Sequence, residues 1–384
     1  MKEGGKVGNI SWAKNKQKQH HPICNETMNK ETMNRAATFH KSIPGYATTP
    51  LYEPKALADK LGIAGLAVKD EGVRFEQGSF KVLGSTYALA AYFAEKEAFG
   101  IFDYASVQKL VDQRPSRTFA TATDGNHGRG LAWAAKLFNQ HANVYLPKGA
   151  SRKRLEVVQE LGAEAEITDV NYDRSVQYVK DRAAKKGWIV AQDTAWEGYT
   201  TFPNWIMQGY LTIVAEVLEQ IRDKQKPTHL ILQAGVGSFA GAIAGCCKQL
   251  FGDDIKIVIV EPARADCLYQ SALADDGHPR QTSGDLSTNM KGLACGEVNP
   301  LAWDILKNVV DAFVTCPDSV ADKGMGLLAR SMENDSQIMA GEAGAVSAGL
   351  LDEIMKNESL AALKEHIGLD EHARVLLINT ESRQ

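Results

Sequence analysis

The feature that most constrains this chain is a set of short apolar runs, each followed by a longer helical segment. His229–Gln233 and Ile255–Val260 are dominated by Leu, Ile and Val, as expected for strands buried on both faces of a parallel sheet. Arg374–Ile378 predicts a third such strand, and segments rich in Gly and Ala separate the three. Strands and helices that alternate in this way predict α/β layers with parallel sheets.

The first half of the chain shows the same alternation with shorter strands. Ser151 is placed to cap one of its helices and Gly162 to end it. The predicted strands are Leu66–Lys69, Thr118–Thr121, Ala142–Leu146, Glu166–Thr168 and Trp188–Val190. The predicted helices are Phe80–Lys96, Leu131–Phe138, the segment from Ser151 to Leu161, and Tyr172–Lys185. A length of 384 residues favours about two domains.

Composition limits which binding partners and which cellular compartment can be expected. The 43 basic and 47 acidic residues leave a net charge of −4, which gives no reason to expect nucleic acid or an anionic membrane. No apolar run is long enough to span a membrane, and the polar residues 1–35 lack the core of a secretory signal. Six cysteines without a C-x-x-C pair suggest reduced thiols. We therefore expect a cytoplasmic protein with a flexible N-terminal arm over residues 1–35.

Ligands of parallel sheets bind beyond the carboxyl ends of the strands, and three such ends carry unusual residues. TATDGNHG, residues 121–128, opens a helix and is either an anion site or a plain capped turn. QAGVGSFAG, residues 233–241, lacks the G-x-x-x-x-G-K-[ST] pattern, so it suits a small phosphate ester better than a nucleoside triphosphate. Close packing of helix on sheet is the alternative for this turn. The third end places Asp193 and Glu197 among aromatic residues.

A lysine in GSFKVLG, residues 78–84, lies between aromatic and aliphatic neighbours at the start of a predicted helix. Lys81 either buries its stem and keeps its amine in water, or it is a desolvated amine that forms a Schiff base with a carbonyl. The heptapeptide alone favours the first interpretation.

The order of these motifs resembles the fold-type II pyridoxal-phosphate enzymes, the group of threonine dehydratase, serine racemase and tryptophan synthase β. More narrowly, TATDGNHGRGLAWAA, QDTAWEGY, LQAGVG and GLACGE resemble the 2,3-diaminopropionate ammonia-lyases, over residues 35–380. The resemblance implies an α/β fold of two domains with open, twisted, mostly parallel sheets and pyridoxal 5′-phosphate in the cleft between them. The expected large cofactor-binding domain comprises residues 36–85 and 213–384, and the small domain residues 86–212. A homodimer is the family expectation.

The resemblance also implies roles for individual residues. Lys81 is the Schiff-base lysine, and Phe80 packs beside the cofactor ring. Asn126 bonds the phenolic oxygen, and Thr380 supplies a hydroxyl to a pyridine nitrogen that stays unprotonated. The phosphate is held by the loop of Gly235, Val236, Gly237 and Ser238, and Glu342 is a further cofactor contact. The substrate carboxylate is held by Thr121, Thr123 and Asn126.

The implied reaction is α,β-elimination of D- or L-2,3-diaminopropionate, through an aldimine, α-proton abstraction and aminoacrylate, to pyruvate and ammonia. Lys81 takes the α-proton from one face and Asp124 from the other, while Asp193 binds the second amino group as an ammonium. No metal is implied.

Three alternatives remain. A threonine, serine or D-serine dehydratase needs no buried carboxylate for its leaving group, and a synthase adds a nucleophile instead. A catalytically inactive binding protein would be indicated by loss of the lysine or of the phosphate loop. One departure from the family pattern is Ala343, where relatives carry a serine in GESGAV.

Overall fold

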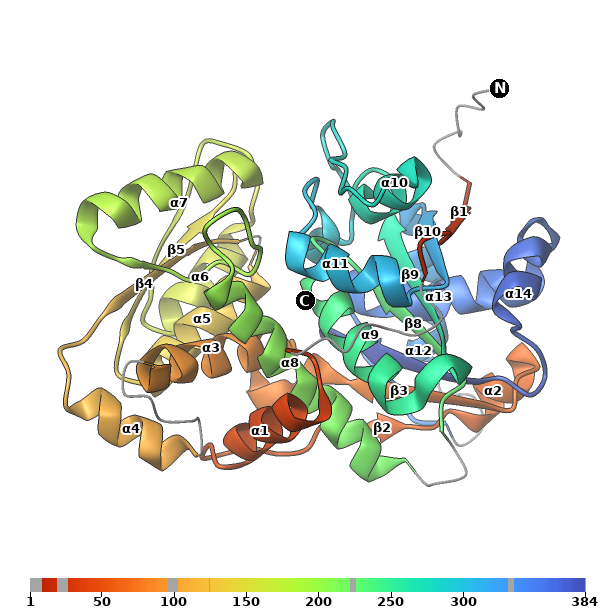
Figure 1. The fold of residues 1–384 in the computed structure, drawn as a ribbon, viewed down its shortest axis with the longest axis horizontal. Coiled ribbons are helices and arrows are strands. Elements are labelled where there is room, and N and C mark those ends of the chain that lie inside the picture. Colours follow the sequence, from red (N-terminus) through yellow and green to blue (C-terminus); the bar gives the residue numbers. More distant parts are fainter. Residues whose placement is uncertain are drawn as a thin grey trace. The chain divides into compact units, whose positions relative to one another are not determined.

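The structure, a computed structural model, describes residues 9–18, 27–95, 103–123, 125–221, 226–330 and 335–383. The chain forms two compact units, which Figure 1 shows with the path of the chain coloured from the N-terminus. The larger unit consists of Met1–Lys30, Thr48–Gly78 and Ile213–Gln384, and the smaller of Glu31–Ala47 and Ser79–Thr212.

In the larger unit, the described strands form a seven-stranded sheet in the order β1-β10-β9-β8-β11-β3-β2. The five central strands are parallel, and the edge strands β1 and β2 pair antiparallel with their neighbours. Every residue of β8 is buried, as its apolar run predicted. The strands are β1 (Ser11–Lys14), β2 (Leu51–Tyr52), β3 (Gly65–Asp70), β8 (His229–Gln233), β9 (Lys256–Pro262), β10 (Ala312–Cys316) and β11 (Arg374–Asn379).

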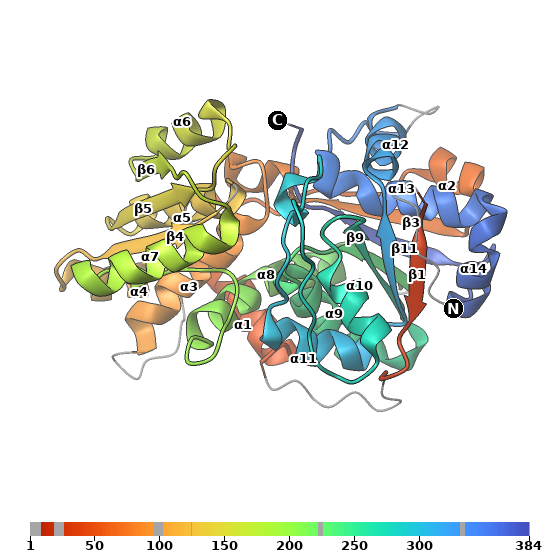
Figure 2. The same ribbon diagram turned by 90° about the horizontal axis from the view of Figure 1, so that it is seen from above.

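Helices cover both faces of this sheet, so that its central strands are buried on both sides. Figure 2 shows α9, α10 and α11 on one side and α2, α12 and α13 on the other. Apart from α8 (Thr201–Gln220), which crosses the boundary between the units, the helices are α2 (Lys55–Leu61), α9 (Ser238–Phe251), α10 (Cys267–Ala274), α11 (Pro300–Val309), α12 (Asp318–Ala329), α13 (Glu342–Lys356) and α14 (Ala361–Ile367).

The described strands of the smaller unit form a four-stranded, fully parallel sheet in the order β6-β5-β4-β7. They are β4 (Thr118–Ala122), β5 (His141–Leu146), β6 (Glu164–Ile167) and β7 (Ile189–Val190). The helices are α1 (Lys30–Lys41), α3 (Lys81–Glu95), α4 (Tyr104–Asp112), α5 (Asn126–Leu137), α6 (Arg152–Glu160) and α7 (Tyr172–Lys186). The predicted cap is confirmed, because Oγ of Ser151 accepts a hydrogen bond from the Arg154 amide.

Helix α3 packs closely on α5, and one glycine permits this contact. A Cβ on Gly130 would lie 2.9 Å from the carbonyl carbon of Lys81, closer than a side chain tolerates. The backbone that carries Lys81 is therefore held directly against α5. This packing explains why the units differ from the expected domains at residues 79–85, which lie in the smaller unit.

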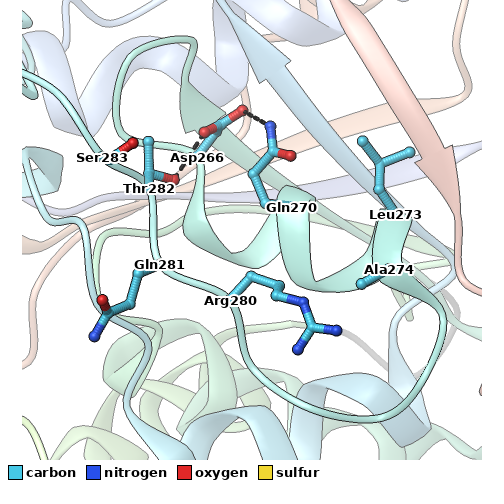
Figure 3. Close-up of a pocket in the computed structure, with 8 residues that line it drawn as sticks. All are labelled: Asp266, Gln270, Leu273, Ala274, Arg280, Gln281, Thr282 and Ser283. Atoms are coloured by element: carbon cyan, nitrogen blue, oxygen red, sulfur yellow. Dashed lines mark hydrogen bonds between the residues drawn. The ribbon is translucent and has the colours of Figure 1, made fainter. Parts of the chain in front are cut away.

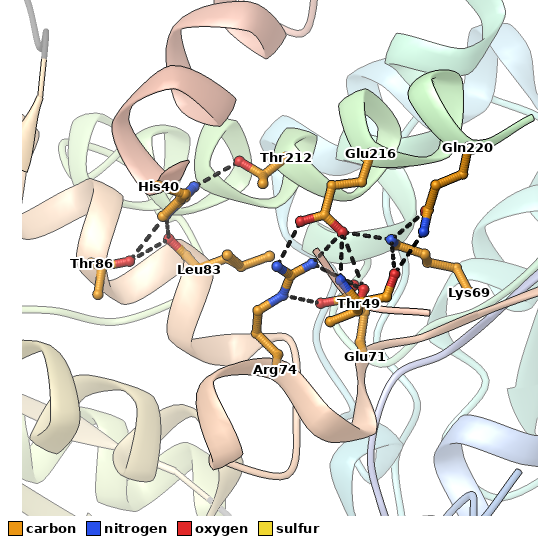
Figure 4. A network of polar contacts seen from close by, with 10 residues as sticks. All are labelled: His40, Thr49, Lys69, Glu71, Arg74, Leu83, Thr86, Thr212, Glu216 and Gln220. Carbon is orange, nitrogen blue, oxygen red and sulfur yellow. Dashed lines mark hydrogen bonds and ion pairs between the residues drawn. The ribbon is translucent and has the colours of Figure 1, made fainter. Parts of the chain in front are cut away.

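His40 attaches helix α1 to other helices of the smaller unit by hydrogen bonds. Nδ1 of His40 is 2.6 Å from Oγ1 of Thr212, and its Nε2 is 3.0 Å from both the Leu83 carbonyl oxygen and Oγ1 of Thr86 (Figure 4). These bonds join α1 to α3 and α8. Within the expected N-terminal arm, residues 11–14 form β1 and residues 30–35 begin α1, whereas residues 1–8 and 19–26 lie outside the described part.

The larger unit contains a buried network of two cations and two carboxylates, also drawn in Figure 4. Glu216 on α8 lies 2.5 Å from Nζ of Lys69 and 2.7 Å from Nη1 of Arg74, while Glu71 lies 2.8 Å from Nη2 of Arg74. All four side chains are fully withdrawn from solvent. Burial alone would raise the pKa of Glu216, but Arg74 and Lys69 outweigh it and lower that pKa to about 2. The network fixes the segment that leads to Gly78.

No helix within the described ranges is both long enough and apolar enough to cross a membrane.

Candidate active site

Lys81 begins α3, and its amine lies against a carboxylate. Nζ is 2.5 Å from Oδ2 of Asp193, and the two side chains are 18% and 8% exposed. The preceding residue, Phe80, is buried, and its ring centroid lies 5.4 Å from the same nitrogen. The amine is therefore largely withdrawn from water and paired, which is not the arrangement of a lysine that merely extends to solvent.

Asp193 follows β7 and is ionised. Its burial opposes ionisation, but the charges of Lys81 and His127 and the bond from Lys81 outweigh burial and lower its pKa to about 2. Nε2 of His127 lies 2.7 Å from the Ala191 carbonyl oxygen, which can only accept, so this nitrogen carries a proton. Nδ1 of the same ring is 3.9 Å from Asp193. Asp193 is thus a buried carboxylate that already binds an ammonium group.

The two threonines predicted to hold the substrate carboxylate differ in their bonds. The hydroxyl of Thr121 donates to Oε1 of Gln192, whose amide is held in that orientation by the backbone of Ala122. Its proton is therefore already used. Oγ1 of Thr123 instead accepts from the amides of Gly125 and Gly128, which leaves its proton available. This geometry favours Thr123 for the carboxylate and gives Thr121 a supporting contact with Gln192.

Two further predicted residues belong to this turn. Asn126 is the first residue of α5 and is partly exposed. Asp124, predicted as the second base, lies outside the described residues.

The predicted phosphate loop joins β8 to α9 in the larger unit. The carbonyl oxygens of Gly235, Val236 and Gly237 each have a protein donor, whereas their backbone N–H groups have no acceptor among the described residues. Unsatisfied amides at the start of a helix form an anion site, because the helix dipole also favours negative charge there. The three donors to the carbonyls are the Cys267 thiol and the amides of Asn299 and Gly241.

The loop has little room for side chains. Gly237 has φ of +97°, a conformation that L-residues rarely adopt, and a Cβ there would lie 3.3 Å from the Ala302 side chain. Oγ of Ser238, the first residue of α9, accepts a 2.7 Å bond from the side-chain amide of Asn299. A compact anion bound by backbone groups suits this loop.

Thr380 and Glu342 complete the predicted residues. Thr380 follows β11, is 5% exposed, and accepts a 2.8 Å bond from Nε2 of Gln233. Glu342 begins α13 and is partly exposed, and the amide of its neighbour Ala343 donates to the Glu381 carboxylate.

A hydrogen bond links the end of the chain to the lysine-bearing segment. The carbonyl oxygen of Gly78 accepts a 2.9 Å bond from the amide of Ser382. Ser382 follows Thr380 by two positions, and Gly78 precedes Lys81 by three.

A cavity of about 580 Å³ lies elsewhere in the larger unit, and Figure 3 shows its lining. Oδ1 of Asp266 accepts from Thr282 and Oδ2 from Gln270, so the carboxylate is satisfied within the wall. None of the predicted site residues lines this cavity. The lining residues are Asp266, Gln270, Leu273, Ala274, Arg280, Gln281, Thr282 and Ser283.

Comparison with known families identifies the chain. Residues 43–380 match the family model described as pyridoxal-phosphate dependent enzyme. The chain belongs to the pyridoxal-phosphate dependent enzymes. It is 44% identical to the diaminopropionate ammonia-lyase of Salmonella typhimurium over 92% of this chain and 90% of that protein. The Escherichia coli diaminopropionate ammonia-lyase is equally similar, at 44% over 90% of this chain and 87% of its own length.

Solved structures show the same relationship. The Escherichia coli enzyme in complex with an aminoacrylate-PLP azomethine reaction intermediate superimposes with a TM-score of 0.89 and 41% identity, covering 98% of this chain and 94% of that one. Its complex with D-serine gives a TM-score of 0.90 at 40% identity, covering 98% and 95%. The α/β fold of type II and the cofactor predicted from the sequence are thus confirmed.

The predicted residues fit pyridoxal 5′-phosphate. Lys81, predicted as the Schiff-base lysine, is mostly buried, three adjacent backbone amides have no acceptor among the described residues, and the buried Thr380 hydroxyl has a proton that no described residue accepts. Sequence reasoning missed His127, Gln192 and Gln233, which support these groups. All three lie inside the quoted motifs, yet nothing local shows which atoms they contact.

Proposed function

We propose that this enzyme eliminates ammonia from 2,3-diaminopropionate and yields pyruvate and a second ammonia. The observation that carries the proposal is the buried Asp193 carboxylate, which binds an ammonium at 2.5 Å. In the structure that ammonium is the side chain of Lys81. The second amino group of diaminopropionate has the same charge and the same donor hydrogens, so Lys81 stands in for it. The similarity to two diaminopropionate ammonia-lyases supports this choice of substrate.

Residues of this chain would hold the cofactor as the family does. Lys81 would bind it covalently through Nζ, and the amides of the loop from Gly235 to Ser238 would hold its phosphate. Phe80, Asn126, Glu342 and Thr380 would surround its ring. When bound, pyridoxal 5′-phosphate supplies the electron sink that stabilises the substrate after the α-proton leaves.

Asp193 has two tasks in this proposal. An amine leaves as neutral ammonia only when it is protonated at departure, and an ionised carboxylate favours that protonated form. The pKa of about 2 keeps Asp193 ionised throughout the neutral range. A substrate ammonium that replaces Lys81 beside Asp193 would also break the present ion pair of Lys81. The Lys81 amine would then be available as the base for the α-proton.

We assign the D and L substrates to two bases. The two isomers, held by the same carboxylate and amine, would carry the α-proton on opposite sides of the α-carbon, so each would need its own base. Lys81 would serve one face and Asp124 the other. Thr123 and Asn126 would hold the carboxylate common to both isomers, with Thr121 in support through Gln192.

The first test is the release of pyruvate from D- and L-2,3-diaminopropionate, compared with serine and threonine. We expect kcat/KM for diaminopropionate to exceed that for either hydroxy amino acid. A preference for serine or threonine would make the enzyme a dehydratase and contradict the proposal. Borohydride reduction followed by peptide mapping should label Lys81, and label on any other lysine would overturn its assignment.

The oligomeric state and the compartment complete the proposal. We propose a cytoplasmic homodimer, for which the family and the ordinary charge balance are the support. Light scattering of the loaded enzyme at micromolar concentration measures the mass directly. A mass of about 42 kDa, that of one 41.9 kDa chain, would contradict the dimer.

A further inference from the structure

Gln233 uses both hydrogens of its side-chain amide. It is the last residue of β8, is 1% exposed, and lies beside β11, the parallel neighbour of β8. Nε2 donates a 2.9 Å bond to the carbonyl oxygen of Ile378 and a 2.8 Å bond to Oγ1 of Thr380. Oε1 has no hydrogen-bond partner within the described part of the chain. The amide thus spans the end of β11 and the hydroxyl beyond it.

The orientation of this amide is dictated by the backbone. The carbonyl oxygen of Ile378 can only accept, so the nitrogen of Gln233 must face it. The reversed amide would bring two oxygens to about the 2.9 Å of that bond and would lose the bond to Ile378. The second amide hydrogen consequently points at Thr380 in every acceptable arrangement.

A fixed amide also fixes the hydroxyl that it contacts. A threonine hydroxyl has one proton and two lone pairs, and one lone pair of Thr380 receives the Gln233 hydrogen. The Thr380 proton must therefore point away from Gln233. No described residue accepts it, although the side chain is 95% withdrawn from solvent. Thr380 is therefore held as a hydrogen-bond donor whose proton points away from Gln233.

We propose that Gln233 is a positioning residue that holds Thr380 as a hydrogen-bond donor and so keeps the pyridine nitrogen of the cofactor unprotonated. The inference rests on the proposed function, in which Thr380 faces that nitrogen. A donor hydroxyl stabilises a nitrogen with a free lone pair and opposes one that carries a proton. An unprotonated ring withdraws fewer electrons, which suits elimination.

Gln233→Glu tests the polarity with almost no change in shape. A neutral glutamic acid has one proton, which the oxygen in the place of Nε2 donates to the Ile378 carbonyl oxygen, so that oxygen offers only lone pairs to Thr380. An ionised glutamate presents only acceptors. In both forms Thr380 turns and donates to residue 233, and its lone pairs then face the ring. A lone pair binds the ring nitrogen only when that nitrogen is protonated.

The readout is the ¹⁵N resonance of pyridoxal phosphate labelled at the ring nitrogen, titrated with pH in the loaded enzyme. We expect the wild-type resonance to stay at the unprotonated position throughout the neutral range. In Gln233→Glu it should move toward the protonated position at the same pH. Gln233→Met is the control, because it also loses the side-chain bonds of residue 233 to Ile378 and Thr380 but offers the Thr380 hydroxyl no carboxyl oxygen as an acceptor. Its resonance should stay nearer to the wild type.

Variants of Thr380 test whether Gln233 acts through the Thr380 hydroxyl or only supports the local packing. In a Thr380→Val background, Gln233→Glu should no longer change the titration, because the hydroxyl that relays its effect is gone. Thr380→Ser should restore the wild-type resonance. Should Gln233→Glu fail to fold, the wild-type titration and Gln233→Met still decide, because Met releases the Thr380 hydroxyl from its fixed direction. A smaller shift toward the protonated position in Gln233→Met supports the inference, and a titration identical to that of the wild type overturns it.

Two results would overturn it. One is a wild-type ring nitrogen already protonated at neutral pH, and the other is an identical titration in wild type, Gln233→Glu and Gln233→Met. Both differ from failure of the proposed function. A protein that binds no cofactor, or that binds it and releases no pyruvate from diaminopropionate, refutes that function instead.

Discussion

Replacing Asp193 by asparagine removes one charge from the centre of the proposed site and keeps the shape of the side chain. The carboxylate is 8% exposed, and its pKa falls from an ordinary 3.8 to about 2. That change alone corresponds to roughly 2 kcal/mol of preference for the ionised form. Breaking a buried ion pair by removing one partner costs about 3–5 kcal/mol. A substrate ammonium escapes part of this cost by losing its proton, which then makes it a poorer leaving group.

We therefore expect Asp193→Asn to lower kcat/KM for 2,3-diaminopropionate by roughly 10²–10³-fold, since about 1.4 kcal/mol is tenfold in rate. D-Serine has a neutral hydroxyl in place of the second amine. It should lose no more than one hydrogen bond, roughly 0.5–1.5 kcal/mol or up to about tenfold. Both reactions release pyruvate, so one coupled assay measures both substrates.

The matched control is Glu197→Gln, which removes a negative charge from the same turn at an exposed position. Its rates on both substrates should stay close to those of the wild type. Stoichiometric cofactor, measured by visible absorbance, must be present in each variant. Equal losses on diaminopropionate and D-serine in Asp193→Asn would refute the reasoning and make Asp193 a structural residue.

Three further changes have defined outcomes. Gly237→Asp should give colourless protein, because its carboxylate repels the phosphate, whereas the equally bulky Gly237→Asn should retain more cofactor; equal retention would place the phosphate elsewhere. Asp124→Asn should slow the D isomer by about 10²–10⁴-fold and the L isomer much less, and parallel losses would leave Asp124 only a helix-capping role. Glu216→Gln should cost about 3–5 kcal/mol of unfolding free energy, against about 0.5 kcal/mol for the exposed Glu219→Gln. Because the folded-state pKa of Glu216 is about 2 and its ordinary value 4.5, its stabilisation is complete above pH 4.5 and disappears as pH falls toward 2. Denaturation midpoints of wild type and variant should thus converge over that window, and a constant difference would contradict this assignment.

Local patterns were sufficient to predict most of the buried parallel strands and the turns that follow them. The apolar run His229–Gln233 predicted a buried strand, and the glycines after it predicted the loop that leaves three amides for an anion. Ser151 and Gly162 marked the ends of one helix correctly. These features depend on neighbours in the sequence, because strand burial, caps and turns are set within a few residues. β10 (Ala312–Cys316) was missed although Pro317 directly follows it, since a short apolar run does not by periodicity alone distinguish strand from helix.

The sequence by itself determined which chemical groups are candidates for the site, while the tertiary structure alone decided which atoms they face. It directed attention to Lys81, yet Lys69 is fully withdrawn from solvent, in a strand whose pattern gives no sign of its distant partner Glu216. The partner of Lys81 lies 112 positions away, and the partner of Thr380 lies 147 positions away. Parallel strands bring such residues together at one edge of a sheet, but the sequence does not state which side chain meets which. The direction of the Thr380 hydroxyl proton, on which the protonation of the cofactor is proposed to depend, follows only from the contact between Thr380 and Gln233.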